Sequence, residues 1–225
     1  MKGCDYLNSI RENIEHVRHT LLEGVTLIAV SKTKSPEEIM EAYEMGIRDF
    51  GENKVQEIEA KYDVLPKDIR WHLIGHLQTN KVRKVLGKTH LIQSLDRSSL
   101  AAEIHKRAEK MNLTVDTLIE INIGEEPQKA GILLKDLPGF LDELKNLNRI
   151  HVKGLMAIIP QGTPEENRQY FRKMKEVFME LKQHEKEHFR MEILSMGMSS
   201  DYETAMQEGS TMVRVGTGIF GSRNY

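Results

Sequence analysis

The chain has 225 residues, of which 39% are hydrophobic and 29% charged, and its formal net charge is −2. This length and composition predict one folded domain over residues 1–225. General nucleic-acid binding is not expected, because it needs a surplus of Lys and Arg. No apolar run approaches the roughly 20 residues that span a bilayer, and the N-terminus lacks a signal peptide. The single cysteine, Cys4, cannot form an internal disulfide, so we expect a protein of the reducing cytoplasm without a membrane partner.

Short β-branched runs alternate with amphipathic stretches along the whole chain. Eight of these runs predict strands, and several are apolar almost throughout, as is typical of parallel strands covered on both faces. The predicted strands are 26–32, 49–52, 70–75, 90–95, 115–123, 152–158, 192–197 and 212–216.

Helix signals lie between the predicted strands. Segments 35–38 (SPEE) and 163–166 (TPEE) each combine an N-cap, a proline in the first turn and a capping-box glutamate. Residues 8–22 predict an additional amphipathic helix, which we expect to close the bottom of the structure. The alternation predicts an α/β fold, a single (β/α)8 TIM barrel with an extra N-terminal helix. An open doubly wound sheet is the alternative, although no linker or long insertion favours it.

Lys32 follows the apolar run 27–30 and would therefore lie at the mouth of the barrel. Burial at such a place lowers the pKa of an amine, and a neutral amine can attack an aldehyde. A lysine that extends to the rim, or one that pairs with Glu52, fits the same position. This residue alone does not decide between a functional and a structural role.

The last two predicted strands run into loops that suit a phosphate group. Phosphate sites in such barrels are usually built there, and 198–201 (MSSD) and 216–221 (GTGIFG) offer hydroxyls and glycine N–H groups. Ser200 and Glu203 have the spacing of a capping box, which would leave Ser199 for a ligand. The spacing G-x-G-x-x-G does not indicate a dinucleotide, because only four residues follow the last glycine.

Arg214 and two histidines are the remaining candidates. Arg214 lies two residues before Gly216, and we expect it to face the barrel interior, where it must be paired or contact a ligand. An outward arginine that contacts a helix is the alternative. His72 and His76 have the spacing of a helical metal pair, but their segment is predicted as a strand. A structural histidine is therefore favoured over a zinc ligand, and we predict no metal site.

Six blocks of sequence resemble the pyridoxal phosphate homeostasis family, whose members are small single-barrel relatives of the alanine racemase N-terminal domain. The resemblance extends over nearly the whole chain. The blocks are 29–32 (AVSK), 50–57 (FGENKVQE), 71–81 (WHLIGHLQTNK), 154–157 (GLMA), 194–199 (LSMGMS) and 213–221 (VRVGTGIFG).

The resemblance implies that the chain holds pyridoxal 5′-phosphate (PLP) as a Schiff base on Lys32. Ser199, Gly216 and Thr217 would hold the phosphate, and Arg214 would face the pyridine nitrogen. The remaining residues that the resemblance places around the cofactor are Asn53, Met156 and His76. Lys129, just beyond the fifth strand, is a candidate secondary amine, although a solvated loop lysine is the favoured interpretation.

The resemblance also implies a role in maintaining the supply of PLP, without catalytic residues of its own. PLP and apo-enzymes that use it would be the partners, and we expect a monomer. A PLP-dependent racemase-type enzyme is the alternative. Racemases need a second acid or base opposite the first, which larger racemases take from an additional C-terminal domain. Because this chain ends at Tyr225, we expect no sustained turnover of amino acids.

Overall fold

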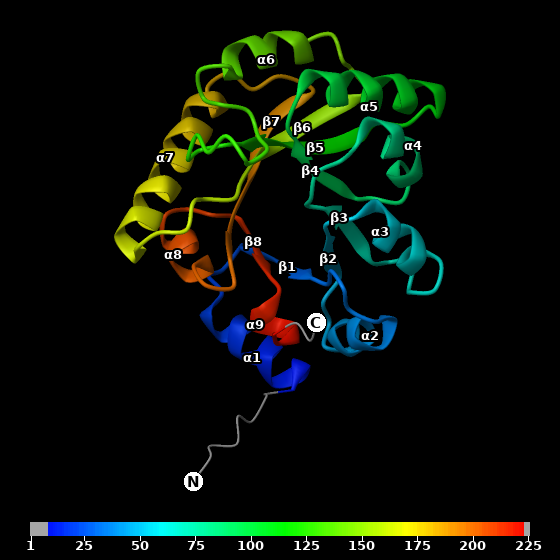
Figure 1. Cartoon of the computed structure of the whole chain (residues 1–225), viewed down its shortest axis with the longest axis vertical. Coiled ribbons are helices and arrows are strands. Elements are labelled where there is room, and N and C mark those ends of the chain that lie inside the picture. Colours follow the sequence, from blue (N-terminus) through cyan, green and yellow to red (C-terminus); the bar gives the residue numbers. More distant parts are fainter. Residues whose placement is uncertain (1–8, 223–225) are drawn as a thin grey trace.

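The computed structural model describes residues 9–222, so Cys4 lies outside the described residues. Strands and helices alternate, and the strands close into a barrel ringed by helices (Figure 1). The strands are β1 (Thr26–Val30), β2 (Asp49–Glu52), β3 (Arg70–Leu73), β4 (Leu91–Leu95), β5 (Val115–Ile121), β6 (Ile150–Ala157), β7 (Phe189–Met198) and β8 (Met212–Val215). The helices are α1 (Ile10–Thr20), α2 (Pro36–Glu44), α3 (Val55–Tyr62), the 3₁₀ turn Thr79–Lys81, α4 (Val82–Val85), α5 (Ser98–Lys110), α6 (Leu137–Leu144), α7 (Pro164–Lys182), α8 (Tyr202–Gln207) and α9 (Thr217–Phe220).

The sheet confirms the predicted barrel and excludes the open sheet. Each strand pairs in parallel with the next strand along the chain, and β8 pairs with β1 from Thr26 opposite Met212 to Ala29 opposite Val215. All eight predicted strands are present, with bounds that differ by a few residues. Within residues 9–222, no helix is both long and apolar enough to cross a bilayer.

Two helices begin at the predicted capping boxes. At α2, the Ser35 hydroxyl accepts from the N–H of Glu38, whose carboxylate accepts from the N–H of Ser35. At α7, Thr163 and Glu166 make the same reciprocal pair. These bonds satisfy N–H groups that have no partner within the helix, so each helix starts at a defined residue.

Helix α1 lies in a different place from the one predicted. It packs against α9 and α2 in the ring around the barrel and does not close the bottom (Figure 1). The amide of Asn13 on α1 donates to the carbonyl oxygen of Ile219 at 2.9 Å. The reason is that α9 has only four residues, too few to cover the strands inside it. Ile14 and Val17 of α1 provide the missing apolar cover.

A glycine in β6 permits close contact between two strands. Gly154 has φ +149°, a conformation that other residues rarely adopt, and a β-carbon there would overlap the carbonyl oxygen of Ile193 on β7. The β6–β7 register shifts at this position. The block 154–157 therefore begins with a residue that the barrel needs for its geometry.

Candidate functional site

A cavity of about 380 Å³ opens at the C-terminal ends of the strands, where β1, β2, β7 and β8 run into their loops. Six of the eight predicted site residues line this cavity: Lys32, Asn53, Ser199, Arg214, Gly216 and Thr217. The structure adds Lys34, Gln161 and Phe220, which sequence reasoning did not select. The volume lies in the range of small-molecule sites, and the position is where barrels of this class bind ligands.

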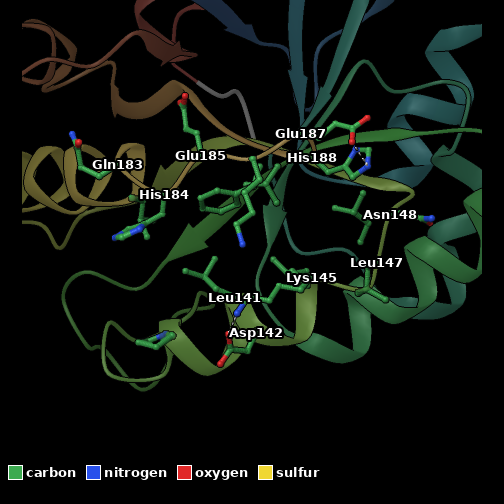
Figure 2. Close-up of a pocket in the computed structure, with 17 residues that line it drawn as sticks. Leu141, Asp142, Lys145, Leu147, Asn148, Gln183, His184, Glu185, Glu187 and His188 are labelled. Carbon is green, nitrogen blue, oxygen red and sulfur yellow. Dashed lines mark hydrogen bonds and ion pairs between the residues drawn. The ribbon is translucent and has the colours of Figure 1, made fainter.

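A larger pocket, of about 810 Å³, lies at the opposite end of β6 and β7, between α6 and the end of α7. Figure 2 shows its charged rim, with Lys145 next to Asp142 and His188 next to Glu187. None of the predicted site residues lines it. We place the functional site in the smaller cavity, because the side chains with recognisable chemistry meet there.

Ser199 organises one wall of the cavity. Its hydroxyl oxygen accepts from the N–H groups of Gly216 and Gly218, each at 3.1 Å. The hydroxyl proton stays available for a ligand atom, and Thr217 adds a second, exposed hydroxyl. Because the N–H groups of Gly216 and Gly218 already donate to Ser199, the hydroxyls of Ser199 and Thr217 are the donors that this wall offers to an anion.

The predicted capping box at Ser200 is wrong. Helix α8 has Asp201 as its N-cap residue, and no side chain caps it. The Asp201 carboxylate instead accepts from the N–H of Met198 at 2.6 Å. The chain turns one residue later than the capping pattern suggested, so Ser199 and Ser200 both line the cavity.

Arg214 reaches the cavity from the barrel interior, as predicted. Only 3% of the residue is exposed, and its guanidinium donates to the Ser195 hydroxyl at 2.6 Å and to the Ala157 carbonyl at 2.8 Å. Burial lowers the pKa of Arg214 to about 10, although Glu120 and Asp201 oppose the shift, so it stays a cation at neutral pH. Within residues 9–222, no carboxylate forms an ion pair with it.

A chain of buried hydrogen bonds extends from Arg214 across the barrel. The Ser195 hydroxyl donates to the Gln93 side-chain oxygen at 2.7 Å, and the Gln93 amide lies 3.1 Å from Nδ1 of His72. His72 Nε2 lies 3.0 Å from the Asp49 carboxylate. An arginine can only donate hydrogen bonds, and an ionised carboxylate can only accept them. Each group between them therefore accepts from its neighbour on the Arg214 side and donates to its neighbour on the Asp49 side.

Asp49 and burial together determine the protonation state of His72. Burial raises the pKa of Asp49, but hydrogen bonds from His72 and Arg70 outweigh it and lower the value to about 2. Burial lowers the pKa of His72. His72 is therefore a neutral imidazole whose Nδ1 accepts from Gln93 and whose Nε2 donates to Asp49. Both ring nitrogens of His72 therefore have partners within the protein.

Glu120 is a buried acid of the barrel interior that sequence reasoning missed. It lies in β5 and is 7% exposed. Burial raises its pKa to about 7, Asp96 adds to the shift, and Arg214 opposes it. The available signal was a charged residue within the apolar run that ends β5, between Leu118–Ile119 and Ile121, since a buried charge is costly unless it is paired.

Lys32 begins the turn that follows β1 and is half-buried. Glu52, which the alternative interpretation paired with Lys32, accepts hydrogen bonds from Ser31 at 2.6 Å and Lys61 at 2.7 Å. Burial raises the pKa of Glu52 to about 7, and the Lys61 ammonium opposes this shift.

Three other candidates do not line the cavity. Met156 is buried in a small apolar cluster with Ile28, Leu118 and others. His76 is exposed, and its Nδ1 lies 2.8 Å from the Asp96 carboxylate. Lys129 donates to the Ile159 carbonyl at 3.2 Å. Within the described part of the chain, no group of three or more His, Cys, Asp or Glu side chains is arranged to hold a metal ion.

The sequence matches the family described as alanine racemase, N-terminal domain, over residues 6–224. A pyridoxal phosphate homeostasis protein of Aquifex aeolicus is 44% identical over 100% of both chains. The chain belongs to this family. A protein of the same name from Haemophilus influenzae is 39% identical and aligns with 97% of this chain and 95% of its own.

Solved structures with the same fold include one of high and one of low sequence identity to this chain. The structure of PipY from Synechococcus elongatus with PLP bound is 39% identical, covers 95% of this chain and 100% of its own, and has a TM-score of 0.87. Alanine racemase from Corynebacterium glutamicum is 14% identical, with a TM-score of 0.76 over 93% of this chain and 59% of its own. That second likeness concerns the fold alone.

Proposed function

We propose that the protein binds PLP in the cavity at the barrel mouth, as a Schiff base on Lys32, and that it maintains PLP supply as a carrier. The observation that carries this proposal is the meeting of three chemistries in one cavity: an amine, a hydroxyl and glycine wall, and a buried cation. The name shared by the relatives and the PLP bound to PipY support the choice of ligand.

The residues of the cavity fit PLP. Ser199, Gly216 and Thr217 form the wall that would bind the phosphate, and Asn53 lines the same cavity. The amine of Lys32, in its neutral form, would attack the aldehyde carbon, and one water molecule would leave as the C=N bond forms. Met156 and His76 would act at most indirectly, because neither lines the cavity.

Arg214 favours a carrier over an enzyme. Bound PLP supplies an electron sink for reactions at the α-carbon of an amino acid, most effectively when its ring nitrogen is protonated. Arg214 has only donors, so a nitrogen that accepts from it must be unprotonated. With Arg214 at the ring nitrogen, the site would bind the cofactor firmly while promoting little chemistry on it.

The attachment site can be tested directly. We expect protein loaded with PLP to have the absorbance of a lysine Schiff base, and borohydride reduction followed by peptide mapping to find the cofactor on Lys32. Lys32→Ala should abolish the absorbance and retain the fold. Lys34→Ala is the matched control, because Lys34 lines the same cavity and bonds to Glu38 and the Phe220 carbonyl, each at 3.0 Å. Reduction products on Lys34 or Lys129, with Lys32 unmodified, would overturn the assignment.

A second assay separates a carrier from a racemase-type enzyme, which the fold shared with alanine racemase keeps as the alternative. The loaded protein should transfer PLP to an apo-enzyme in an activation assay and should not racemise or decarboxylate amino acids. Turnover well above that of free PLP, and lost in Lys32→Ala, would refute the carrier.

A further inference from the structure

The turn that carries Lys32 has an unusual backbone. Thr33, the next residue, has φ +66°, and it is one of three residues other than glycine with positive φ in the described part of the chain. A threonine in this region is strained and persists only where its surroundings hold it. Here the N–H of Thr33 donates to the carboxylate of Glu57 on α3 at 2.6 Å.

The residue on the other side of Lys32 is held by the same group of side chains. The Ser31 hydroxyl donates to Glu52 at 2.6 Å, and its carbonyl oxygen accepts from the Lys61 ammonium at 2.9 Å. Lys61 also donates to Glu52 at 2.7 Å and to Glu57 at 3.1 Å. Three ionisable side chains are therefore joined through Lys61, which bonds to both acids, and together they bond to both neighbours of Lys32.

These charges occupy positions that would normally be apolar. Lys61 lies on the buried face of α3 with Val55 and Ile58, and Glu52 is fully buried at the end of β2. A buried ion pair contributes little net stability, because desolvation of the two groups offsets their attraction. Packing alone would favour an apolar side chain at these sites. A role in geometry explains the arrangement better.

We propose that Glu57, Glu52 and Lys61 are positioning residues that fix the backbone on both sides of Lys32, so that its amine enters the cavity in one orientation. This inference rests on the proposed attachment of PLP to Lys32. It gives the block 50–57 a function beyond Asn53, because that block supplies both acids. None of the three needs to touch the cofactor.

Glu57→Ala is the most informative change, because it removes the acceptor of the strained Thr33 N–H and still leaves Lys61 bonded to Glu52 and to the Ser31 carbonyl. Lys61 variants are less useful, since they leave two acids without their cation. Glu57→Gln keeps an acceptor oxygen. Thr33→Gly combined with Glu57→Ala removes the acceptor and the strain together, because glycine adopts positive φ freely.

The measurement is the second-order rate constant for PLP attachment, followed by absorbance after mixing apo-protein with PLP. We expect Glu57→Ala to slow attachment about tenfold or more, the effect of losing one charge-assisted hydrogen bond. Glu57→Gln should stay within about threefold of the wild type by the same reasoning. The Thr33→Gly, Glu57→Ala double variant should recover most of the rate. Amide hydrogen exchange in apo-protein should be faster at 31–34 in Glu57→Ala than in the wild type and in Glu57→Gln.

Glu185→Ala is the matched control. Glu185 also accepts from a backbone N–H, that of Met191 at 2.8 Å, but it lies at the other end of the barrel. Its removal should leave the attachment rate unchanged. Equal rates in Glu57→Ala and the wild type, or equal slowing in Glu57→Ala and Glu185→Ala, would overturn the inference. A wild-type protein that forms no Schiff base on Lys32 would instead refute the proposed function.

Discussion

Replacing Glu120 by glutamine should remove a pH-dependent loss of stability. Burial raises the pKa of Glu120 from 4.5 to about 7, so the folded protein holds a proton that the unfolded chain releases. This contribution to stability is complete below the unfolded pKa, near 4.5, and is lost as pH rises through the folded pKa, near 7. At 1.36 kcal/mol for each pKa unit, the loss amounts to about 3 kcal/mol. Glutamine is a neutral analogue of the protonated acid, so the variant does not lose this stability as the pH rises.

The assay is urea unfolding of apo-protein between pH 5 and pH 8, with the wild type and Glu120→Gln compared at each pH. The free energy of unfolding of the variant should rise relative to the wild type by up to about 3 kcal/mol over this interval. Glu187→Gln is the control, because its side chain is 88% exposed, and its difference from the wild type should not vary with pH. A difference for Glu120→Gln that stays constant from pH 5 to pH 8 would show that Glu120 is ionised throughout, which contradicts the argument from burial.

Further predictions concern the phosphate wall, the buried hydrogen-bond chain and the barrel geometry. Thr217→Val should weaken PLP binding roughly tenfold but hardly affect unphosphorylated pyridoxal, as measured by titration; equal losses would assign Thr217 to the fold. Ser195→Ala removes one of the two hydrogen bonds of Arg214 and should weaken PLP binding. Ser210 is the control, because its buried hydroxyl bonds to backbone carbonyls. Ser210→Ala should lower the melting temperature without changing the affinity for PLP. If both serine variants bind PLP equally well, Arg214 does not depend on that bond. Gly154→Ala should cost more than about 3 kcal/mol of stability in urea unfolding, because its β-carbon would collide with β7.

Local patterns were sufficient to predict the barrel. Apolar runs of strand length and capping boxes such as Ser35 with Glu38 depend on residues close in sequence, and both appear in the structure. The rule that strand ends converge then selected Lys32 and the loop around Ser199, and the cost of a buried, unpaired arginine selected Arg214. All three line one cavity. These predictions needed only the order of the strands.

Contacts inside the barrel could not be predicted in the same way. Gln93 and Ser195 are polar residues in apolar strands, and their pairing depends on the register across the barrel, to which no local pattern refers. Local sequence patterns also do not show which way a side chain at a strand end points. His76 turns toward Asp96, and Met156 packs into the core, although both belong to blocks that also contain interior or cavity residues.

The environment of Arg214 connects the buried acid to the proposed function. Its two hydrogen bonds go to a hydroxyl and a carbonyl, which are neutral groups. Glu120 is close enough to affect its pKa, but burial keeps a large fraction of that acid protonated near pH 7. An acid bonded directly to the guanidinium would neutralise it and leave little charge for a ligand. The neutral partners orient the cation and leave its charge to the cavity, where an electron-rich atom of a bound cofactor could accept its remaining N–H groups.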